Sequence, residues 1–252
     1  MVLSIVNHKG GAGKTTTTIN LGAALSAEGY RVLLIDFDAQ GSLSYSLGVD
    51  DSTPTIAEAL VGDAPVRDLL IEREGFHMLP AGSALADVEL AIARADDRFN
   101  HLKRLLTMLP DYDFVLIDCP PSLSLLTLNA LVASDRLLIP MQLDVLSLRG
   151  LDMMLETFQN ISALNPGLEI IGVLPIMVDL RKNINREILG HIQENYTVHV
   201  FNQSIRTSVK AAEAPSFGKS VINYAPSATT SADFRALAKE IAKLTEQKTI
   251  QN

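Results

Sequence analysis

The residues most able to do chemistry stand near the start of the chain, in the stretch His8-Lys9-Gly10-Gly11-Ala12-Gly13-Lys14-Thr15-Thr16. Glycines in such a loop let successive backbone N–H groups converge on phosphate oxygens, and a following helix adds the positive end of its dipole. Lys14 would then reach the β- and γ-phosphates of a nucleotide, and the Thr15 hydroxyl would take a Mg²⁺ position. The spacing therefore predicts a phosphate-binding loop.

The segments on either side of the loop are those that such a loop requires. Residues 2–6 form a short apolar run typical of a buried strand, and residues 17–25 have the apolar spacing of a helix. Two positions depart from the standard pattern G-x-x-x-x-G-K-[ST]: His8 replaces the first glycine, and Lys9 is a second lysine inside the loop. Lys9 is either a solvated loop lysine or a cation that meets another phosphate.

Carboxylates follow two further apolar runs. Residues 31–38 end in Asp36 and Asp38, and another run ends in Asp118. Because ligands bind at the carboxyl edge of a parallel sheet, we expect both earlier acids to point towards the phosphate loop. Each could instead be a capping or loop aspartate. Asp118 could hold Mg²⁺, usually through its water, with Thr15 as the second protein ligand.

The composition is that of an ordinary globular protein, with 252 residues, 47% hydrophobic and 20% charged. No apolar run approaches the ~18 residues of a membrane span. Because the N-terminus leads straight into the first strand, we expect no signal peptide. The net charge of −8 argues against wholesale nucleic-acid binding but leaves room for a local basic patch. The single cysteine, Cys119, excludes an internal disulfide and fits a reducing cytoplasm. We expect it to be a buried core residue and not a reactive thiol.

Apolar strand-like runs alternate with helical spacing along the chain. We therefore predict a single α/β domain over residues 1–252, a doubly wound and mainly parallel sheet with helices on both faces. The later elements that we expect are a helical stretch over 84–107, strands over 136–142 and 168–176, and helices over 146–164 and 232–246.

The loop sequence Lys-Gly-Gly-Ala-Gly-Lys-Thr-Thr resembles the deviant Walker A motif of the ParA/MinD group of P-loop ATPases. Residues 36–42, 118–122 and 212–221 resemble further stretches of that family, so the likeness covers nearly the whole chain. Ala39 stands where the family has proline, and family members often carry a glutamate where this chain has Arg149.

The resemblance implies a Mg²⁺-dependent ATP hydrolase. Asp38 matches the family aspartate that orients the attacking water, and Lys9 matches the lysine that reaches the partner's ATP across a nucleotide-sandwich dimer. The end of the strand before Met177 lies near the adenine in the family. The chain shows no Asn-Lys-x-Asp contact for guanine, which favours ATP. The implied nucleotide-binding residues are Lys9, Gly10, Gly11, Ala12, Gly13, Lys14, Thr15 and Thr16.

The resemblance also implies partners. ParA-like ATP dimers bind DNA without sequence preference and move a cargo that bears a ParB-like adaptor, so we expect a cytoplasmic, nucleoid-associated protein. Because the chain starts at its first strand, we expect it to lack the N-terminal DNA-binding domain of larger plasmid members. The candidate DNA contacts are Arg181, Lys182, Arg186, Arg206, Lys210 and Lys219.

Three alternatives remain at this point. A MinD-like, membrane-associated division-site regulator is disfavoured, because residues 232–246 are alanine-rich with mixed charges and lack a bulky apolar face flanked by cations. A relative that positions a protein cargo, such as a carboxysome or a chemotaxis cluster, is not separated by the sequence. A redox iron protein would need two cluster cysteines per subunit, and Cys119 alone does not supply them.

Overall fold

The protein is described here from a computed structural model, which describes residues 1–50, 53–179 and 181–249. Its strands form one sheet in the order β3-β4-β2-β5-β1-β6-β7-β8. All neighbours pair in parallel except β3 and β4, which form an antiparallel hairpin at one edge. The strands are β1 (Val2–Ile5), β2 (Val32–Asp36), β3 (Ile71–Arg73), β4 (Phe76–Leu79), β5 (Phe114–Asp118), β6 (Arg136–Gln142), β7 (Glu169–Val178) and β8 (Ile205–Arg206).

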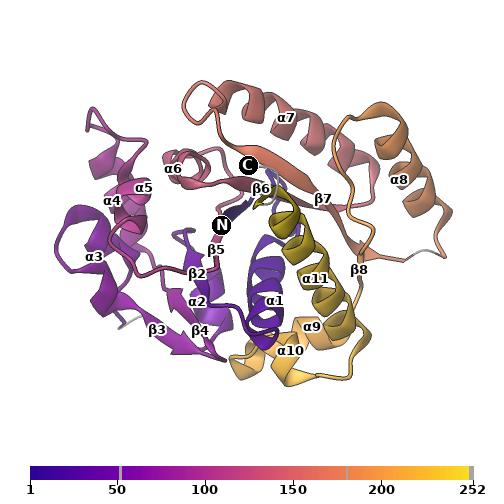
Figure 1. The fold of residues 1–252 in the computed structure, drawn as a ribbon, viewed down its shortest axis with the longest axis horizontal. Helices are drawn as coiled ribbons and strands as arrows, with labels where there is room; N and C mark the ends of the chain where they lie inside the picture. Colours follow the sequence, from indigo (N-terminus) through magenta and orange to yellow (C-terminus); the bar gives the residue numbers. More distant parts are fainter. Residues whose placement is uncertain (51–52, 180, 250–252) are drawn as a thin grey trace.

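Helices cover both faces of the sheet, as Figure 1 shows. The long ones are α1 (Lys14–Ala27), α7 (Val145–Ile161), α8 (Asn183–Asn195) and α11 (Thr229–Thr249). The shorter ones are α2 (Ser42–Ser46), α3 (Ile56–Val61), α4 (Ala84–Ile92), α5 (His101–Leu106), α6 (Leu125–Ala133), α9 (Val209–Glu213) and α10 (Val221–Tyr224), with 3₁₀ turns at Val66–Leu69 and Ala214–Phe217. The predicted doubly wound, mainly parallel sheet is confirmed.

Successive residues of a strand pack alternately into two separate hydrophobic cores, one on each face of the sheet. Leu3 and Ile5 of β1 pack with α1 and α11 on one face, whereas Leu33 and Ile35 of β2 pack with the α3–α8 helices on the other. Side chains of a strand point to opposite faces in turn, and both faces here are covered, so these strands are largely apolar, with Ser4 in β1 and the terminal Asp36 of β2 as the polar positions. Helices α1 (indigo) and α11 (yellow), from opposite ends of the chain, lie side by side in Figure 1.

Three predicted helical stretches differ from the structure. The helix expected over 146–164 is α7, which ends at Ile161. The stretch 84–107 contains two helices, α4 and α5, separated by turns. Between them the backbone forms single turns, with the Ala95 N–H bonded to the Ile92 carbonyl and the Arg98 N–H to the Ala95 carbonyl. The Arg98 carbonyl also accepts a hydrogen bond from Asn129 Nδ2 at 2.7 Å. The last helix begins at Thr229 and not at residue 232. The expected burial of Cys119 is confirmed, and burial raises the pKa of its thiol.

Candidate nucleotide-binding site

The loop between β1 and α1 starts at the centre of the sheet, because β1 lies between β5 and β6. Asn7 holds the first residues of the loop in place. Its Nδ2 donates to the Pro140 carbonyl at 2.7 Å, and its Oδ1 accepts from the Lys9 N–H at 2.8 Å. Gly13 has φ of +71°, and a Cβ there would lie 2.5 Å from the Ile176 side chain. The positive φ favours glycine at this position, whereas the Ile176 methyl group is the end of a flexible side chain that could shift.

The loop leaves open the space that phosphate oxygens would need. A Cβ added to Gly10 or Gly11 would meet no atom within 4 Å. Lys14, the first residue of α1, is only 8% exposed. Burial lowers the pKa of Lys14, while the nearby Asp118 and Asp38 carboxylates act in the opposite direction. The predicted phosphate-loop residues and two of the three predicted acids are thus brought to one place.

Asp118 is the buried acid of the site. It ends β5, beside the last residue of β1, and is 1% exposed. Neither of its carboxylate oxygens has a hydrogen-bond partner in the described part of the chain. Burial and the nearby Asp36 raise the pKa of Asp118 well above its ordinary value. The nearby Thr15 hydroxyl and Lys14 ammonium favour the charged carboxylate and offset this rise only in part.

A buried carboxylate without partners is costly unless a cation or a donor completes it. Mg²⁺ prefers oxygen ligands and usually keeps several waters, so Asp118 and the Thr15 hydroxyl have the chemistry to hold it. Among the residues that the structure describes, no group of three or more His, Cys, Asp or Glu could form a metal cage. Mg²⁺ held here would therefore need further oxygen ligands from a bound nucleotide or water.

The two acids after β2 have different environments. Asp36 is completely buried beside Asp118 on the neighbouring strand, and its Oδ2 accepts hydrogen bonds from the Ser44 N–H at 2.8 Å and the Ser44 hydroxyl at 2.7 Å. Burial raises the pKa of Asp36 to about 6 despite these bonds. Asp38 is only partly buried, and its Oδ1 accepts from the Gln40 N–H at 3.0 Å. Asp36 is thus a structural acid that holds the start of α2, whereas Asp38 is available to a ligand.

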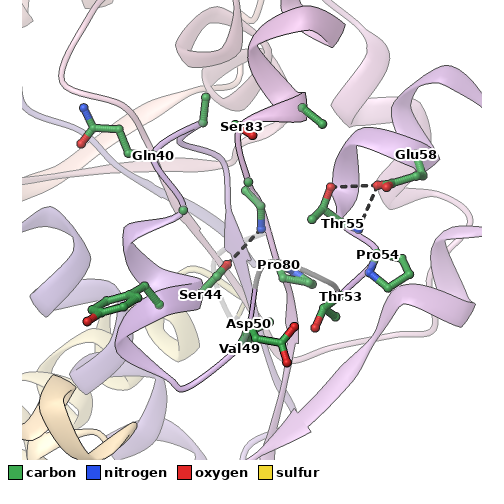
Figure 2. Close-up of a pocket in the computed structure, with 16 residues that line it drawn as sticks. Gln40, Ser44, Val49, Asp50, Thr53, Pro54, Thr55, Glu58, Pro80 and Ser83 are labelled. Carbon is green, nitrogen blue, oxygen red and sulfur yellow. Dashed lines mark hydrogen bonds between the residues drawn. The ribbon is translucent and has the colours of Figure 1, made fainter.

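The loop after Asp38 borders a cavity of about 500 Å³ between α2, α3 and the end of β4 (Figure 2). Ser44 lies at one wall, where its hydroxyl also accepts the Ala81 N–H at 3.0 Å. Across the cavity Thr55 and Glu58 bond to each other and cap α3. The Asp38 loop is therefore anchored through Ser44 to both β2 and the segment after β4.

The second lysine of the loop is held by its own chain. Lys9 Nζ lies 2.7 Å from Asp144 Oδ2, 3.3 Å from Gln142 Oε1 and 3.4 Å from the Ser147 hydroxyl. Asp144 also caps α7, since its Oδ1 accepts from the Ser147 N–H at 2.8 Å. Burial raises the pKa of Asp144, but the bonds from Lys9 and Ser147 outweigh this and lower it. This group was not predicted from the sequence, in which only the Asp-x-x-Ser helix cap before α7 can be recognised.

A second cavity, of about 280 Å³, adjoins the loop on the α11 side. We call it the α11 cavity; its wall includes Gly13 and Thr16 of the loop region and Ile176, Ile205 and Phe234 from β7, β8 and α11. It lies at the end of β7, where the resemblance places the adenine. The sequence did not reveal its walls because they come from four distant segments.

Three of the six candidate DNA contacts are held by carboxylates. Arg181 donates to Asp179 at 2.8 Å, Arg206 to the buried Asp233 at 3.0 Å, and Lys210 to Glu213 at 2.9 Å. The Arg181 bonds lower the pKa of Asp179 to about 2. No ion pair is formed, within the described residues, by the other three, Lys182, Arg186 and Lys219.

The last helix uses its apolar face inside the protein. Phe234, Leu237 and Ile241 are buried against α1 and the sheet, as the prediction of packing requires. Over the ranges that the structure describes, no helix combines the length and the apolar character of a membrane span.

Comparison with known proteins agrees with this geometry. Residues 1–170 match a family model described as an AAA domain. The chain is 40% identical to the chromosome partitioning protein ParA of Caulobacter vibrioides, covering 95% of this chain and 93% of the relative. It is also 40% identical to the sporulation initiation inhibitor protein Soj of Bacillus subtilis, covering 96% and 98%.

Two solved structures extend the comparison. Cobyrinic acid a,c-diamide synthase from Mycobacterium smegmatis, with bound ADP and magnesium, superposes with a TM-score of 0.87 at 34% identity, over 97% of this chain and 95% of that one. The septum site-determining protein MinD of Pyrococcus horikoshii, complexed with Mg-ADP, has a TM-score of 0.77 at 26% identity, over 97% and 96%. With a phosphate loop, a buried Asp118 and relatives of this similarity over nearly its whole length, the chain belongs to the ParA/Soj family of partitioning ATPases.

Proposed function

We propose that the chain hydrolyses ATP with Mg²⁺ and that its ATP-bound dimer binds DNA without sequence preference to partition a DNA cargo. The observation that carries the proposal is the buried, unpartnered Asp118 carboxylate beside Lys14 and the open phosphate loop. The relatives named as chromosome partitioning proteins and the neighbours with bound ADP and magnesium support it.

Each residue of the site has a role in this reaction. The loop N–H groups and Lys14 would hold the β- and γ-phosphates and balance the charge that develops between them. Bound Mg²⁺ would supply further positive charge there, with Thr15 and Asp118 on its protein side. Asp38 would accept a hydrogen bond from water and orient it towards the γ-phosphorus. The new oxygen–phosphorus bond forms as the bond to the bridging oxygen breaks, which gives ADP and phosphate.

The α11 cavity would take the base. Its wall is largely apolar, as is usual for the ring-binding part of a ligand site, and Gly13 and Thr16 connect it to the phosphate loop. An adenine in this cavity and a triphosphate along residues 10–16 would together span the end of β1 and the start of α1.

The dimer depends on Lys9. A lysine that reaches the partner's phosphates must first leave Asp144, Gln142 and Ser147. ATP supplies the competing negative charge, so dimerisation would follow nucleotide binding. This would tie turnover to the dimer.

DNA binding would use charges that the chain does not already neutralise. Lys182, Arg186 and Lys219 fit that description better than Arg181, Arg206 and Lys210, which are held by carboxylates. A dimer would make twice as many contacts with DNA phosphates as a monomer. Because the dimer would form only with ATP, DNA binding would depend on ATP. The family resemblance further implies a ParB-like adaptor that would stimulate hydrolysis. A MinD-like membrane role has less support, because the apolar face of α11 is buried within the protein.

Calorimetric titration with ATP, with and without Mg²⁺, tests the proposal. The parent protein should bind ATP more tightly with Mg²⁺. Asp118→Asn should keep binding ATP but lose most of the gain from Mg²⁺, whereas Asp111→Asn, an exposed acid before β5, should behave as the parent. A full Mg²⁺ effect in Asp118→Asn would contradict the assignment.

A further inference from the structure

Gln142, the last residue of β6, lies between the phosphate loop and the end of β7. Strand β6 has β1 on one side and β7 on the other, so a side chain at its carboxyl end can reach both neighbouring segments. The Gln142 Nε2 donates to the Gly11 carbonyl of the loop at 3.2 Å and to the Met177 thioether at 3.0 Å. Its Oε1 accepts from Lys9 Nζ at 3.3 Å. One side chain therefore joins three parts of the site.

The chemistry of these three partners matches an amide. A lysine ammonium only donates hydrogen bonds, whereas a carbonyl or a thioether only accepts them, so the partners determine which end of the amide faces which group. A glutamate at position 142 could accept from Lys9 but could not donate to Gly11 or Met177. A methionine of similar length could do neither. Glutamine supplies both the donors and the acceptor that these contacts need.

The hydrogen bond to Gly11 acts on an exposed peptide of the phosphate loop. Gly11 has φ of +72°, and its carbonyl belongs to the same peptide unit as the Ala12 N–H. That N–H donates to the Lys9 carbonyl at 3.4 Å, so the peptide is held on both sides. A loop of this kind stabilises phosphate through its N–H groups, whereas a carbonyl oxygen turned towards the ligand would repel the phosphate oxygens. Gln142 thus holds a carbonyl that could oppose ligand binding.

The hydrogen bond to Met177 fixes the amide itself. Met177 has φ of +52°, a left-handed conformation that residues other than glycine rarely adopt. Such a conformation persists where surrounding contacts hold it. The preceding residue, Ile176, pairs with Gln142 in the sheet. The Met177 sulfur takes one amide hydrogen and leaves the other for Gly11, and neither bond requires Lys9.

We propose that Gln142 is a positioning residue of the phosphate loop: its amide N–H holds the Gly11 carbonyl away from a bound triphosphate, whether or not Lys9 occupies the amide oxygen. The inference rests on the proposed function, since it requires a triphosphate on the loop. In this role Gln142 acts through Gly11 and not on the reacting atoms. It would keep the loop in order after Lys9 has left for the phosphates of a second subunit.

A spectroscopic signal distinguishes this role from a merely structural one. The Ala12 amide shares a peptide unit with the Gly11 carbonyl, so its NMR chemical shift responds to the hydrogen bond at that carbonyl. In the nucleotide-free protein, Gln142→Met should move the Ala12 signal, because both N–H donors are lost. Gln142 is partly exposed, so the melting temperature should stay within about 2 °C of the parent value. An unmoved Ala12 signal would overturn the inference.

Calorimetry in the presence of Mg²⁺ tests the effect on the ligand, with ATP and with tripolyphosphate, which lacks the base. Gln142→Met should bind both about 3- to 10-fold more weakly than the parent, the change expected for one hydrogen bond. The same loss should appear when Gln142→Met is added to Lys9→Ala, because the Gly11 bond does not need Lys9. Gln159→Met, the same change at an exposed glutamine of α7, should alter neither affinity.

The outcomes separate this inference from the proposed function. Unchanged affinity for both ligands would overturn the role of Gln142 and leave the phosphate loop intact. A loss for ATP alone would overturn it too, by moving the effect to Met177, and a loss that disappears in Lys9→Ala would move it to Lys9. A parent protein that binds neither ligand would overturn the proposed function itself. If Gln142→Met did not fold, Gln142→Leu, which is also neutral and lacks the donors, would give the same comparison.

Discussion

The Lys9 ammonium lies 2.7 Å from the Asp144 carboxylate of the same chain. Both side chains are partly exposed, at 33% and 40%, so the ion pair contributes only about 0–1 kcal/mol. It is strong enough to place the lysine and weak enough to be exchanged for a triphosphate. We expect the two contacts to compete, because a lysine that reaches across to a phosphate of a second subunit would have to leave Asp144.

Asp144→Asn should therefore strengthen the ATP-dependent dimer. Asparagine caps a helix as well as aspartate, so α7 should remain intact while the charge that holds Lys9 is lost. With two such pairs per dimer at ~0.5 kcal/mol each, the dissociation constant should fall roughly fivefold. Sedimentation at saturating ATP over a range of protein concentrations would measure it.

Lys9→Ala is the control for that experiment. It should bind ATP as a monomer but form no ATP-dependent dimer, with or without Asp144→Asn. An unchanged dimer in Lys9→Ala would make Lys9 an ordinary loop lysine. An unchanged dissociation constant in Asp144→Asn would show that the two contacts do not compete.

Asp38→Ala should separate ATP binding from hydrolysis. Without a carboxylate to orient water, the variant should bind ATP, dimerise and stall, with turnover reduced about 10²-fold or more. Single-turnover hydrolysis of pre-bound ATP would show the loss directly. Normal turnover in this variant would move the role to another group.

Asp36→Ala should act on stability instead. It would leave the buried N–H and hydroxyl of Ser44 without their acceptor, so the free energy of unfolding should fall by about 1–3 kcal/mol. Urea unfolding without nucleotide would measure this, and Asp38→Ala, whose carboxylate is partly exposed, should change stability much less. Equal losses in the two variants would contradict the division of roles.

The phosphate loop and Asp118 could be predicted because local sequence places them. Each stands at the end of an apolar strand, and parallel strands bring their carboxyl ends to one edge. The Lys9–Asp144 pair could not be predicted, since its members are 135 residues apart and meet only when β1 and β6 pair. The Arg206–Asp233 ion pair could not be predicted either, for the same reason. Asp233 neutralises the charge of Arg206, which is one of the candidate DNA contacts.

The hydrophobic spacing of the sequence was least informative where the helices are short. Residues 84–107 carry continuous helical spacing, yet the chain turns between α4 and α5, and there the Arg98 carbonyl bonds to Asn129 of α6, a residue distant in the sequence. Asp36 and Asp38 look alike in the sequence, two residues apart after one strand. Only the position of Ser44, eight residues later, makes the first one structural.

DNA binding should need ATP, ignore sequence and weaken steeply with salt. Lys219→Ala and Arg186→Ala should each lower the affinity and make the log–log salt slope shallower by about 0.9 per lost phosphate contact. Arg181→Ala and Lys210→Ala should have smaller effects, because Asp179 and Glu213 already neutralise those side chains. Filter binding of random-sequence duplex would measure all four. No ATP-dependent retention at low salt would contradict DNA partitioning and favour a protein cargo or a membrane.

The most direct test of the central claim is the rate of ATP hydrolysis with and without Mg²⁺ in the parent protein and in Lys14→Ala. Lys14 is the buried cation of the open loop and lies near both Asp38 and Asp118. The parent should hydrolyse ATP slowly and only with Mg²⁺. Lys14→Ala should hydrolyse it at least about 100-fold more slowly than the parent. Lys103→Ala, an exposed lysine on α5, should keep it. Hydrolysis at the parent rate by Lys14→Ala would contradict the account.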